Sequence, residues 1–283
     1  MTRPVLHPRL TAARSDLADS RLRELVAAER YVDGTIRRVV DGSAPLRRDP
    51  RPDSPLDTEL LHGETVRVFE ETAEGWAWVK ADGDGYVGWC PSAAFGPADA
   101  APTHRVRVLR TFVYPGPSIK LPPAVMLSMN SPVSVSSVDG DFARADIGFV
   151  HAGHLCRLDE FEPDWVSVAE AFLGTPYLWG GRTSIGLDCS ALVQMALAAA
   201  GIDCPRDTDM QEADLGSAID ERDPTRLERG DLLFWQGHVA IARGDGSMVH
   251  ANGHHMDTVI EDIAGAVGRI AEVGLPVTSV RRL

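Results

Sequence analysis

The sequence has no long apolar run. Residues 1–30 are interrupted throughout by Arg, Asp and Glu, so they lack the apolar core of a secretory signal peptide. The stretch from Ser15 to Arg30 is instead typical of an amphipathic surface helix, and residues 1–30 are expected to form a helical N-terminal extension. No other stretch is long and apolar enough to span a bilayer. We therefore expect a cytoplasmic protein without a membrane partner.

Cysteine is also scarce. The chain has four cysteines in 283 residues, at irregular spacing and without a CxxC pair. Neither a disulfide framework nor a zinc site is indicated by this pattern. No metal and no organic cofactor are therefore expected.

Positive charge is in short supply. Acidic residues number 41 against 28 basic ones, for a formal net charge of -13. So acidic a chain is a poor candidate for binding nucleic acid or an anionic membrane surface. It remains able to attract a substrate that carries an amine.

Two styles of sequence meet near residue 160. Between residues 31 and 158, short apolar runs such as Thr65–Phe69 and Trp76–Val79 are broken by Gly, Pro and Asp, as in small all-β modules. The stretch from Pro97 to Pro102 has the composition of a linker that divides this region in two.

A weak internal repeat supports the division. Each of the two segments ends with a Gly-aromatic-Val element followed by a short turn. These elements are Gly85-Tyr86-Val87 and Gly148-Phe149-Val150. This pattern resembles the end of a bacterial SH3-like barrel, in which a last strand follows a Gly-Tyr-Val element. The resemblance implies one SH3-like domain at 31–98 and a second, degenerate one at 103–158.

Beyond Pro163 the pattern changes to mixed helix and strand. Residues 166–173 and 188–200 are predicted helices, and Gly201 follows the second where a glycine cap belongs. Strands are predicted at 232–235, 238–243 and 247–251. Helices beside a small sheet indicate an α+β arrangement.

Cys189 stands at the start of the second predicted helix. A thiol there meets the positive end of the helix dipole and free backbone N–H groups, which favour the thiolate. Most lone cysteines are structural, so the position of Cys189 alone does not identify it as a nucleophile. The residues that could act with it must be considered.

His238 is the strongest candidate partner. Gly244-Asp245-Gly246 predicts a three-residue hairpin loop, which sets His238 opposite Asn252 and diagonal to His250 on the same sheet face. Diagonal neighbours lie roughly 7–8 Å apart, within reach of two imidazole side chains. His250 is therefore expected to orient His238 as the base of a nucleophile–base–orienter triad.

Five short motifs, in this order, resemble the NlpC/P60 cysteine peptidases, a papain-like family that acts on cell-wall peptides. The matching motifs are Pro176-Tyr177-Leu178-Trp179-Gly180-Gly181, Asp188-Cys189-Ser190, Arg229-Gly230-Asp231-Leu232-Leu233-Phe234, Gly237-His238-Val239 and Val249-His250-Ala251. Each motif alone is weak, but all five occur in order within a region that covers nearly half the chain. The resemblance implies a papain-like α+β catalytic domain at 163–283.

The resemblance also implies roles for individual residues. Cys189, His238 and His250 would form the triad, and the Tyr177 hydroxyl and the Cys189 backbone N–H would form the oxyanion hole. His254 and His255 are rivals for the orienting role, although both lie past the expected strand end.

SH3-like modules before such a domain resemble one branch, the γ-D-glutamyl-L-diamino acid endopeptidases, which require a free N-terminal L-Ala. In that branch an aspartate after the catalytic helix grips the substrate amine, and the match is Asp207. Trp179 would line the same subsite, and the first SH3-like module would add Tyr86 and Glu59, with Glu64 as rival. Three neighbouring positions complete the implied substrate contacts: Asp188, Ser190 and Thr208.

The implied substrate is a small murein peptide, L-Ala-γ-D-Glu-diamino acid, released during peptidoglycan recycling. A free ammonium in a partly closed pocket needs carboxylate partners, since its desolvation otherwise costs several kcal/mol. Other interpretations stay open. They are hydrolysis of the intact wall with the SH3-like modules as wall-binding domains, a binding module on an inactive domain, and thiol chemistry on a different bond.

Overall fold

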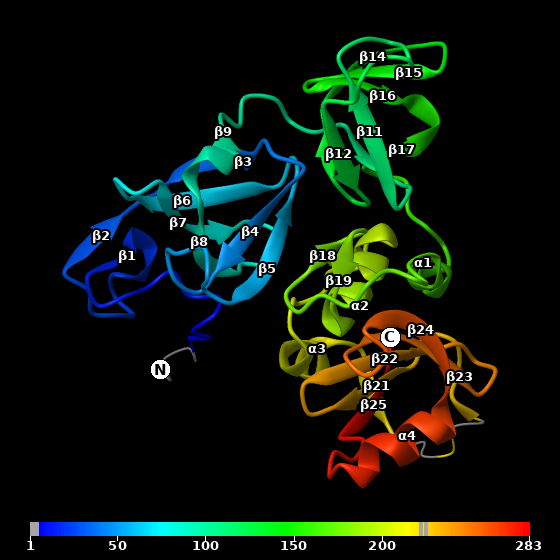
Figure 1. Ribbon diagram of the computed structural model, residues 1–283. Helices are drawn as coiled ribbons and strands as arrows, with labels where there is room; N and C mark the ends of the chain where they lie inside the picture. Colours follow the sequence, from blue (N-terminus) through cyan, green and yellow to red (C-terminus); the bar gives the residue numbers. More distant parts are fainter. Residues whose placement is uncertain (1–5, 221–222, 224–225) are drawn as a thin grey trace. The chain divides into compact units, whose positions relative to one another are not determined.

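The computed structural model describes residues 6–220, 223 and 226–283. The chain divides into two compact units, residues 1–158 and 159–283 (Figure 1). Among the described residues, all four α-helices belong to the second unit, and the first unit is built from strands and 3-10 turns. The predicted α+β class is thereby confirmed. Across all the residues that the structure describes, no helix has the length and apolar content that crossing a membrane requires.

The first β module of unit one is a seven-stranded antiparallel sheet. Its strands are β3 (Thr35–Val39), β4 (Ser43–Arg47), β5 (Leu56–Leu61), β6 (Thr65–Glu71), β7 (Trp76–Ala81), β8 (Val87–Pro91) and β9 (Phe95–Gly96). Their order is β5-β4-β8-β7-β6-β3-β9, so β6, β7 and β8 form the central meander. The two apolar runs quoted above lie on β6 and β7, as predicted.

The predicted N-terminal helix is wrong. The segment instead contains β1 (Leu17–Asp19), the 3-10 turn η1 (Ser20–Leu22) and β2 (Arg30–Val32), with β1 and β2 paired in parallel. Leu17 is buried in one cluster with Phe69, Trp78 and Trp89 of the first β module. A surface helix would have left Leu17 on an exposed stripe, whereas the strand inserts it between aromatic rings, and burial of apolar area decides the outcome.

Arg14 fastens this segment to the same module. Its guanidinium lies over the rings of Trp78 and Trp89, with 4.4 and 5.0 Å to the ring centroids, and also pairs with Glu70 at 2.6 Å. Cation–π contacts of this kind add to the burial of Leu17. Residues 6–32 therefore belong to the packed module.

The second β module has a five-stranded and a three-stranded sheet. Its strands are β10 (His104–Val106), β11 (Arg110–Tyr114), β12 (Val125–Ser128), β13 (Pro132–Val133), β14 (Val135–Asp139), β15 (Phe142–Ala145), β16 (Gly148–His151) and β17 (Leu155–Arg157). The orders are β12-β11-β16-β15-β14 and β13-β10-β17. The repeat seen in the sequence is structural, because β8 and β16 each run into a 3-10 turn, η2 (Ser92–Ala94) and η3 (Ala152–His154), and then a short strand.

Unit two has a six-stranded sheet, order β20-β25-β21-β22-β23-β24, with helices packed on it. The strands of that sheet are β20 (Ser217–Ile219), β21 (Leu232–Trp235), β22 (His238–Ala242), β23 (Ser247–Asn252), β24 (Asp257–Asp262) and β25 (Ser279–Arg282). Outside it lie the two short strands β18 (Arg182–Thr183) and β19 (Gly186–Leu187). Its helices are α1 (Trp165–Ala171), α2 (Cys189–Ala199), α3 (Thr208–Asp214) and α4 (Ile263–Glu272). The predicted helices and strands of this region are confirmed to within a few residues.

The two faces of this sheet have different helices. Ala240, Ala242 and Met248 pack with Ile263 and Ala266 of α4 in one core cluster. Alternate strand residues point to the opposite face, where α2 packs against β22 and β23. Strand β22 is therefore covered by α2 on one face of the sheet and by α4 on the other.

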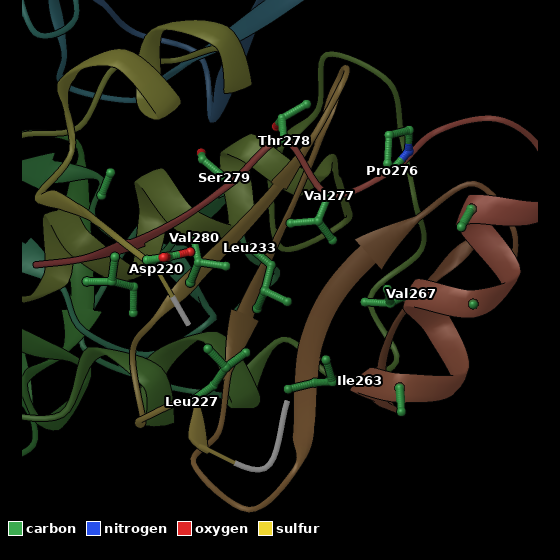
Figure 2. A pocket seen from close by; sticks show the side chains of 15 residues that line it. Asp220, Leu227, Leu233, Ile263, Val267, Pro276, Val277, Thr278, Ser279 and Val280 are labelled. Atoms are coloured by element: carbon green, nitrogen blue, oxygen red, sulfur yellow. The ribbon is translucent and has the colours of Figure 1, made fainter. Parts of the chain in front are cut away.

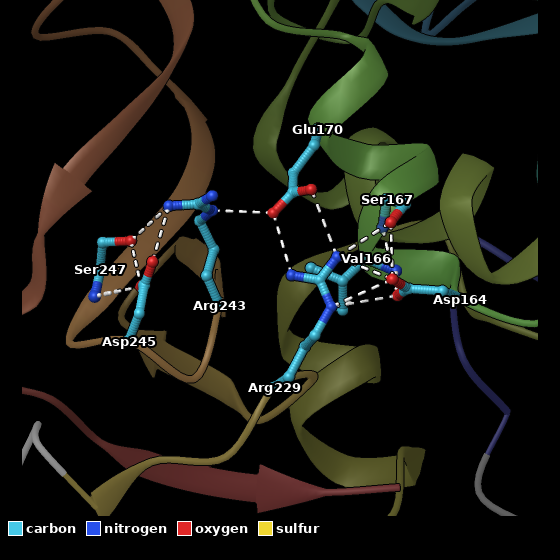
Figure 3. A network of polar contacts seen from close by, with 8 residues as sticks. All are labelled: Asp164, Val166, Ser167, Glu170, Arg229, Arg243, Asp245 and Ser247. Carbon is cyan, nitrogen blue, oxygen red and sulfur yellow. Dashed lines mark hydrogen bonds and ion pairs between the residues drawn. The ribbon is translucent and has the colours of Figure 1, made fainter.

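A polar network joins α1 to the β22–β23 hairpin (Figure 3). Arg229 pairs with Asp164 at 2.8 Å and with Glu170 at 3.0 Å, and Glu170 also receives Arg243 at 2.7 Å. Arg243 in turn reaches Asp245 in the hairpin loop at 3.1 Å. Networks of this kind restrict the hairpin more than an isolated surface pair would.

Leu17→Ala tests whether the N-terminal segment is part of the core. We expect the free energy of unfolding to fall by about 2–5 kcal/mol, because the substitution leaves a cavity beside the tryptophans. Ile36→Ala is the control, since Ile36 is 48% exposed, and should cost about 1 kcal/mol or less. Denaturant unfolding followed by tryptophan fluorescence measures both, and equal costs would mean that the segment is peripheral.

Candidate active site

Cys189 is the first residue of α2 and is almost completely buried. The preceding residue, Asp188, caps the helix by accepting a hydrogen bond from the Ala191 N–H at 2.8 Å. Gly201, in a left-handed conformation with φ of 75°, follows the helix as predicted. The thiol is thereby held at the positive end of the helix dipole.

The resting thiol is nevertheless protonated, contrary to the expectation that its helix position favours thiolate. Burial raises the pKa of Cys189 to about 12, and the Asp188 carboxylate adds to that rise. The backbone N–H groups of Val239 and Ser190 and the guanidinium of Arg206 act in the opposite direction and are outweighed. Desolvation therefore exceeds the favourable dipole at this helix end.

The predicted pair of histidines meets in the structure. β22 and β23 pair with Ile241 opposite Val249 and Ala242 opposite Met248, which is the predicted register. In that register His238 is diagonal to His250, and His238 Nε2 lies 2.9 Å from His250 Nδ1. Burial lowers the pKa of His238 to about 3 and that of His250 to about 4, so both rings are neutral near pH 7.

Glu261 on β24 is a neighbour that the sequence analysis missed. Its Oε2 lies 2.8 Å from His250 Nε2, and Arg269 on α4 pairs with the same carboxylate at 2.7 Å. The signal was present in the β-branched run Thr258-Val259-Ile260, which predicts a strand after the hairpin. Antiparallel pairing of that strand with β23 makes Glu261 the diagonal neighbour of His250.

Tyr177 lies near the thiol, on a segment fixed at two points. Its N–H donates to the Met256 carbonyl at 3.1 Å, and it forms an isolated parallel bridge with Leu187, two residues before Cys189. Burial raises the pKa of the Tyr177 hydroxyl, and the nearby Cys189 and Asp188 raise it further. The hydroxyl therefore stays protonated and keeps its hydrogen to donate.

Arg206 and Asp188 form a buried ion pair that the sequence analysis also missed. Arg206 Nη1 donates to Asp188 Oδ1 at 2.9 Å and Nη2 donates to Oδ2 at 2.8 Å, and the arginine is 1% exposed. Arg206 Nη1 also reaches Ser190 Oγ at 2.9 Å, and the Gly180 N–H donates to Asp188 Oδ2 at 2.9 Å. Such bidentate geometry is strong and orientation-specific.

Of the predicted substrate contacts in unit two, Asp207 and Thr208 stand at the start of α3. Asp207 is half-buried, and its side chain makes no capping hydrogen bond to that helix. Trp179 is 68% exposed on the same segment as Tyr177. The side chains of Asp188 and Ser190 are hydrogen bonded to each other at 3.1 Å and to Arg206, so their contact with a substrate remains a prediction.

The remaining predicted contacts belong to unit one. Tyr86 is buried just before β8, and Glu59 is half-buried on β5, with its Oε1 3.5 Å from Ser43 Oγ. The rival, Glu64, accepts a hydrogen bond from the Leu61 N–H at 2.9 Å and so closes the turn between β5 and β6. Glu64 therefore has a local structural role in that turn.

His254, His255 and Cys204 make local contacts. His255 donates its backbone N–H to Asn252 Oδ1 at 2.8 Å, and its ring packs against that of His254. Cys204 receives the side-chain amide of Gln211 at 3.3 Å. Across residues 6–220, 223 and 226–283, no group of three or more His, Cys, Asp or Glu side chains is arranged to hold a metal ion.

An apolar pocket of about 840 Å³ lies between α4 and β25 (Figure 2). Its walls include Leu227, Leu233, Ile263, Val267 and Val277. None of the predicted site residues lines this pocket, so it is separate from the candidate active site.

Two family models match the chain. One, described as the bacterial dipeptidyl-peptidase Sh3 domain, matches residues 46–95, and the other, the NlpC/P60 family, matches residues 174–267. The crystal structure of an NlpC/P60 family protein from Bacillus cereus superposes with a TM-score of 0.74 at 23% identity, covering 88% of this chain and 99% of that one. That structure therefore has the same fold.

Two relatives are similar over most of their length. Dipeptidyl-peptidase 6 of Lysinibacillus sphaericus is 29% identical over 240 residues, which are 76% of this chain and 86% of the relative. Gamma-D-glutamyl-L-lysine dipeptidyl-peptidase of Bacillus subtilis is 30% identical over 228 residues, which are 70% of this chain and 73% of the relative.

Arg206→Met tests the buried ion pair. We expect a loss of about 3–5 kcal/mol in the free energy of unfolding, because the Asp188 carboxylate would be left buried without its partner. Adding Asp188→Asn removes the charge, keeps a capping side chain and should restore part of the loss. Arg226→Met, at a side chain that is 74% exposed, is the control. Urea unfolding followed by circular dichroism measures the free energy of unfolding of the wild type and of the three variants. A double variant no more stable than Arg206→Met would contradict the charge argument.

Proposed function

The chain belongs to the NlpC/P60 family and is a cysteine peptidase, and we propose that it cleaves the γ-D-Glu–diamino acid bond of murein peptides with a free N-terminal L-Ala. The observations that support the proposal are three contacts within unit two: Tyr177 lies near Cys189, the Val239 N–H beside His238 is hydrogen bonded to Cys189, and His238 pairs with His250. The name of the Bacillus subtilis relative, gamma-D-glutamyl-L-lysine dipeptidyl-peptidase, supports the γ-D-glutamyl bond.

In the proposed reaction His238 takes the proton of the Cys189 thiol, and the sulfur attacks the γ-carbonyl carbon of D-Glu. The neutral imidazole suits this task because it has a lone pair to accept the proton. The imidazolium then gives that proton to the leaving amine of the diamino acid. Water, deprotonated by His238, hydrolyses the thioester and releases L-Ala-D-Glu and the free thiol.

The tetrahedral intermediate carries a negative oxygen that needs donors. We assign that role to the Tyr177 hydroxyl and the Cys189 backbone N–H. Each is a fixed donor: the tyrosine segment is held by two backbone contacts, and the N–H belongs to the unpaired first turn of α2. Removing one such donor typically costs roughly 3–4 kcal/mol in transition-state stabilisation.

For the substrate amine we propose Asp207 as the principal carboxylate, with Trp179 and Thr208 beside it. Asp207 is suited to this because it is only partly buried at the start of α3, directly after Arg206 in the sequence. Asp188 and Ser190 line the same region, and unit one is proposed to contribute Tyr86 and Glu59. An ammonium group matched by carboxylates would select peptides whose L-Ala is not joined to glycan.

Such substrates arise when the wall is broken down, so we propose a role in peptidoglycan recycling in the cytoplasm. The four cysteines are all free thiols, the state that a reducing compartment preserves. Hydrolysis of the intact wall is the competing function, and it differs in needing no free amine.

The first test compares L-Ala-γ-D-Glu-diaminopimelate with its N-acetylated form, with products identified by mass spectrometry. We expect cleavage after D-Glu, and kcat/KM at least about 30-fold lower for the acetylated peptide, because a desolvated carboxylate without its charge partner costs roughly 2–5 kcal/mol. Cys189→Ala is the blank and should show no turnover. Equal cleavage of both peptides would remove the amine pocket and favour wall hydrolysis.

Asp207→Asn tests the amine partner by binding alone. In a Cys189→Ala background, which cannot turn the peptide over, we expect Asp207→Asn to raise the Kd of the free-amine peptide by about 10-fold or more. Asp209→Asn, on the exposed first turn of the same helix, is the matched control and should stay within about 2-fold. Calorimetric titration gives both values, and unchanged affinity in Asp207→Asn would overturn the assignment.

A further inference from the structure

Four charged or polar side chains from four elements form one hydrogen-bonded row that ends at the proposed base. His238 Nε2 lies 2.9 Å from His250 Nδ1, and His250 Nε2 lies 2.8 Å from Glu261 Oε2. Arg269 Nη2 lies 2.9 and 2.7 Å from the two oxygens of Glu261. The row therefore runs from β22 through β23 and β24 to α4, across one face of the sheet.

The outer member of the row is an ionised carboxylate. Burial tends to raise the pKa of Glu261, but hydrogen bonds from Arg269 and His250 outweigh it and hold the pKa below its usual value. An ionised carboxylate only accepts hydrogen bonds. The proton between Glu261 and His250 must therefore sit on His250 Nε2.

That one proton determines the positions of the others. A neutral imidazole has a single N–H, so His250 Nδ1 is left with a lone pair. The contact of 2.9 Å between His250 Nδ1 and His238 Nε2 is then a hydrogen bond only if His238 Nε2 bears the proton. His238 Nδ1 is left as the basic nitrogen.

A rival donor stands at the same nitrogen of His250. The Asn252 amide nitrogen lies 3.0 Å from His250 Nε2, and its orientation is set because Asn252 Oδ1 accepts from the His255 N–H. Without Glu261, that amide would favour an unprotonated Nε2. His250 would then hold its proton on Nδ1 and donate it to His238 Nε2, so His238 would carry its proton on Nδ1 and lose its base.

We propose that Glu261 is a positioning residue that fixes the tautomers of His250 and His238 and so keeps Nδ1 of His238 as the base. The inference rests on the proposed function only in giving His238 the role of base. The tautomers themselves can be observed whatever the substrate is.

Glu261 also has an electrostatic effect that separates its role from simple packing. Its charge raises the pKa of His250 and, more weakly, of His238, whereas Arg269 lowers both and the His255 ring lowers that of His250. The other charged or titratable group that acts on His238 is His250, which lowers its pKa, and on the α2 side the Val239 N–H that follows His238 is hydrogen bonded to Cys189. Loss of the Glu261 charge should therefore move the acid limb of the pH–rate profile to lower pH, since a less basic imidazole protonates at lower pH.

The experiment compares Glu261→Leu with Glu261→Gln in the full chain. Glu261→Leu is expected to lower kcat by about 10²–10⁴-fold, the range that a general base contributes, with little change in KM. Glu261→Gln can still present an oxygen to His250 Nε2, so it should keep most of the activity and show the acid-limb shift. Nitrogen-15 spectra of the histidine rings should show His250 protonated on Nε2 in the wild type and in Glu261→Gln, and on Nδ1 in Glu261→Leu.

Two further variants sharpen the test. Arg269→Gln leaves the carboxylate on His250 and should keep the wild-type tautomers. Glu261→Leu with Asn252→Ala removes the rival donor and should recover part of the lost kcat. Wild-type tautomers and a kcat within about 3-fold in Glu261→Leu would overturn the inference. If the wild type leaves the murein peptide uncut, the proposed substrate fails, while the spectra still decide the role of Glu261.

Discussion

One buried carboxylate ties together the segments that make the site in unit two. Asp188 accepts hydrogen bonds from the Gly180 N–H, the Ala191 N–H and the guanidinium of Arg206. These donors come from the loop after Tyr177, from α2 and from the segment before α3. An unpaired buried charge is costly, so all three segments must be in place together. The thiol, the proposed oxyanion donor and the proposed amine-binding segment are thus linked to one shared anion.

The imidazole pair depends on a different constraint, the length of one loop. Gly244 and Gly246 both have positive φ, which lets three residues close the β22–β23 hairpin. Because side chains alternate along a strand, the loss or gain of one residue there would turn His250 to the opposite face. The network of Arg229 and Arg243 holds the same hairpin from outside. Local turn chemistry therefore determines the geometry of the pair.

Features set by local signals were predictable from the sequence. The terminal Gly201 and the Gly244-Asp245-Gly246 loop predicted the end of α2 and the hairpin, and the family resemblance carried by the five motifs is confirmed. The N-terminal helix failed because a short amphipathic pattern does not reveal that Leu17 packs against Trp78 and Trp89, about sixty residues further along. Glu261 and Arg206 were missed for the same reason, since their value lies in partners brought close only by folding. The roles of Asp207, Glu59 and Tyr86 stay predictions.

The burial of Cys189 also affects how the protein survives between turnovers. Peroxides attack thiolates far faster than thiols, and they must reach the sulfur to do so. Cys189 is 5% exposed, and burial raises the pKa of its thiol to about 12. The same burial that makes the Cys189 thiol a weak acid therefore limits its contact with oxidants.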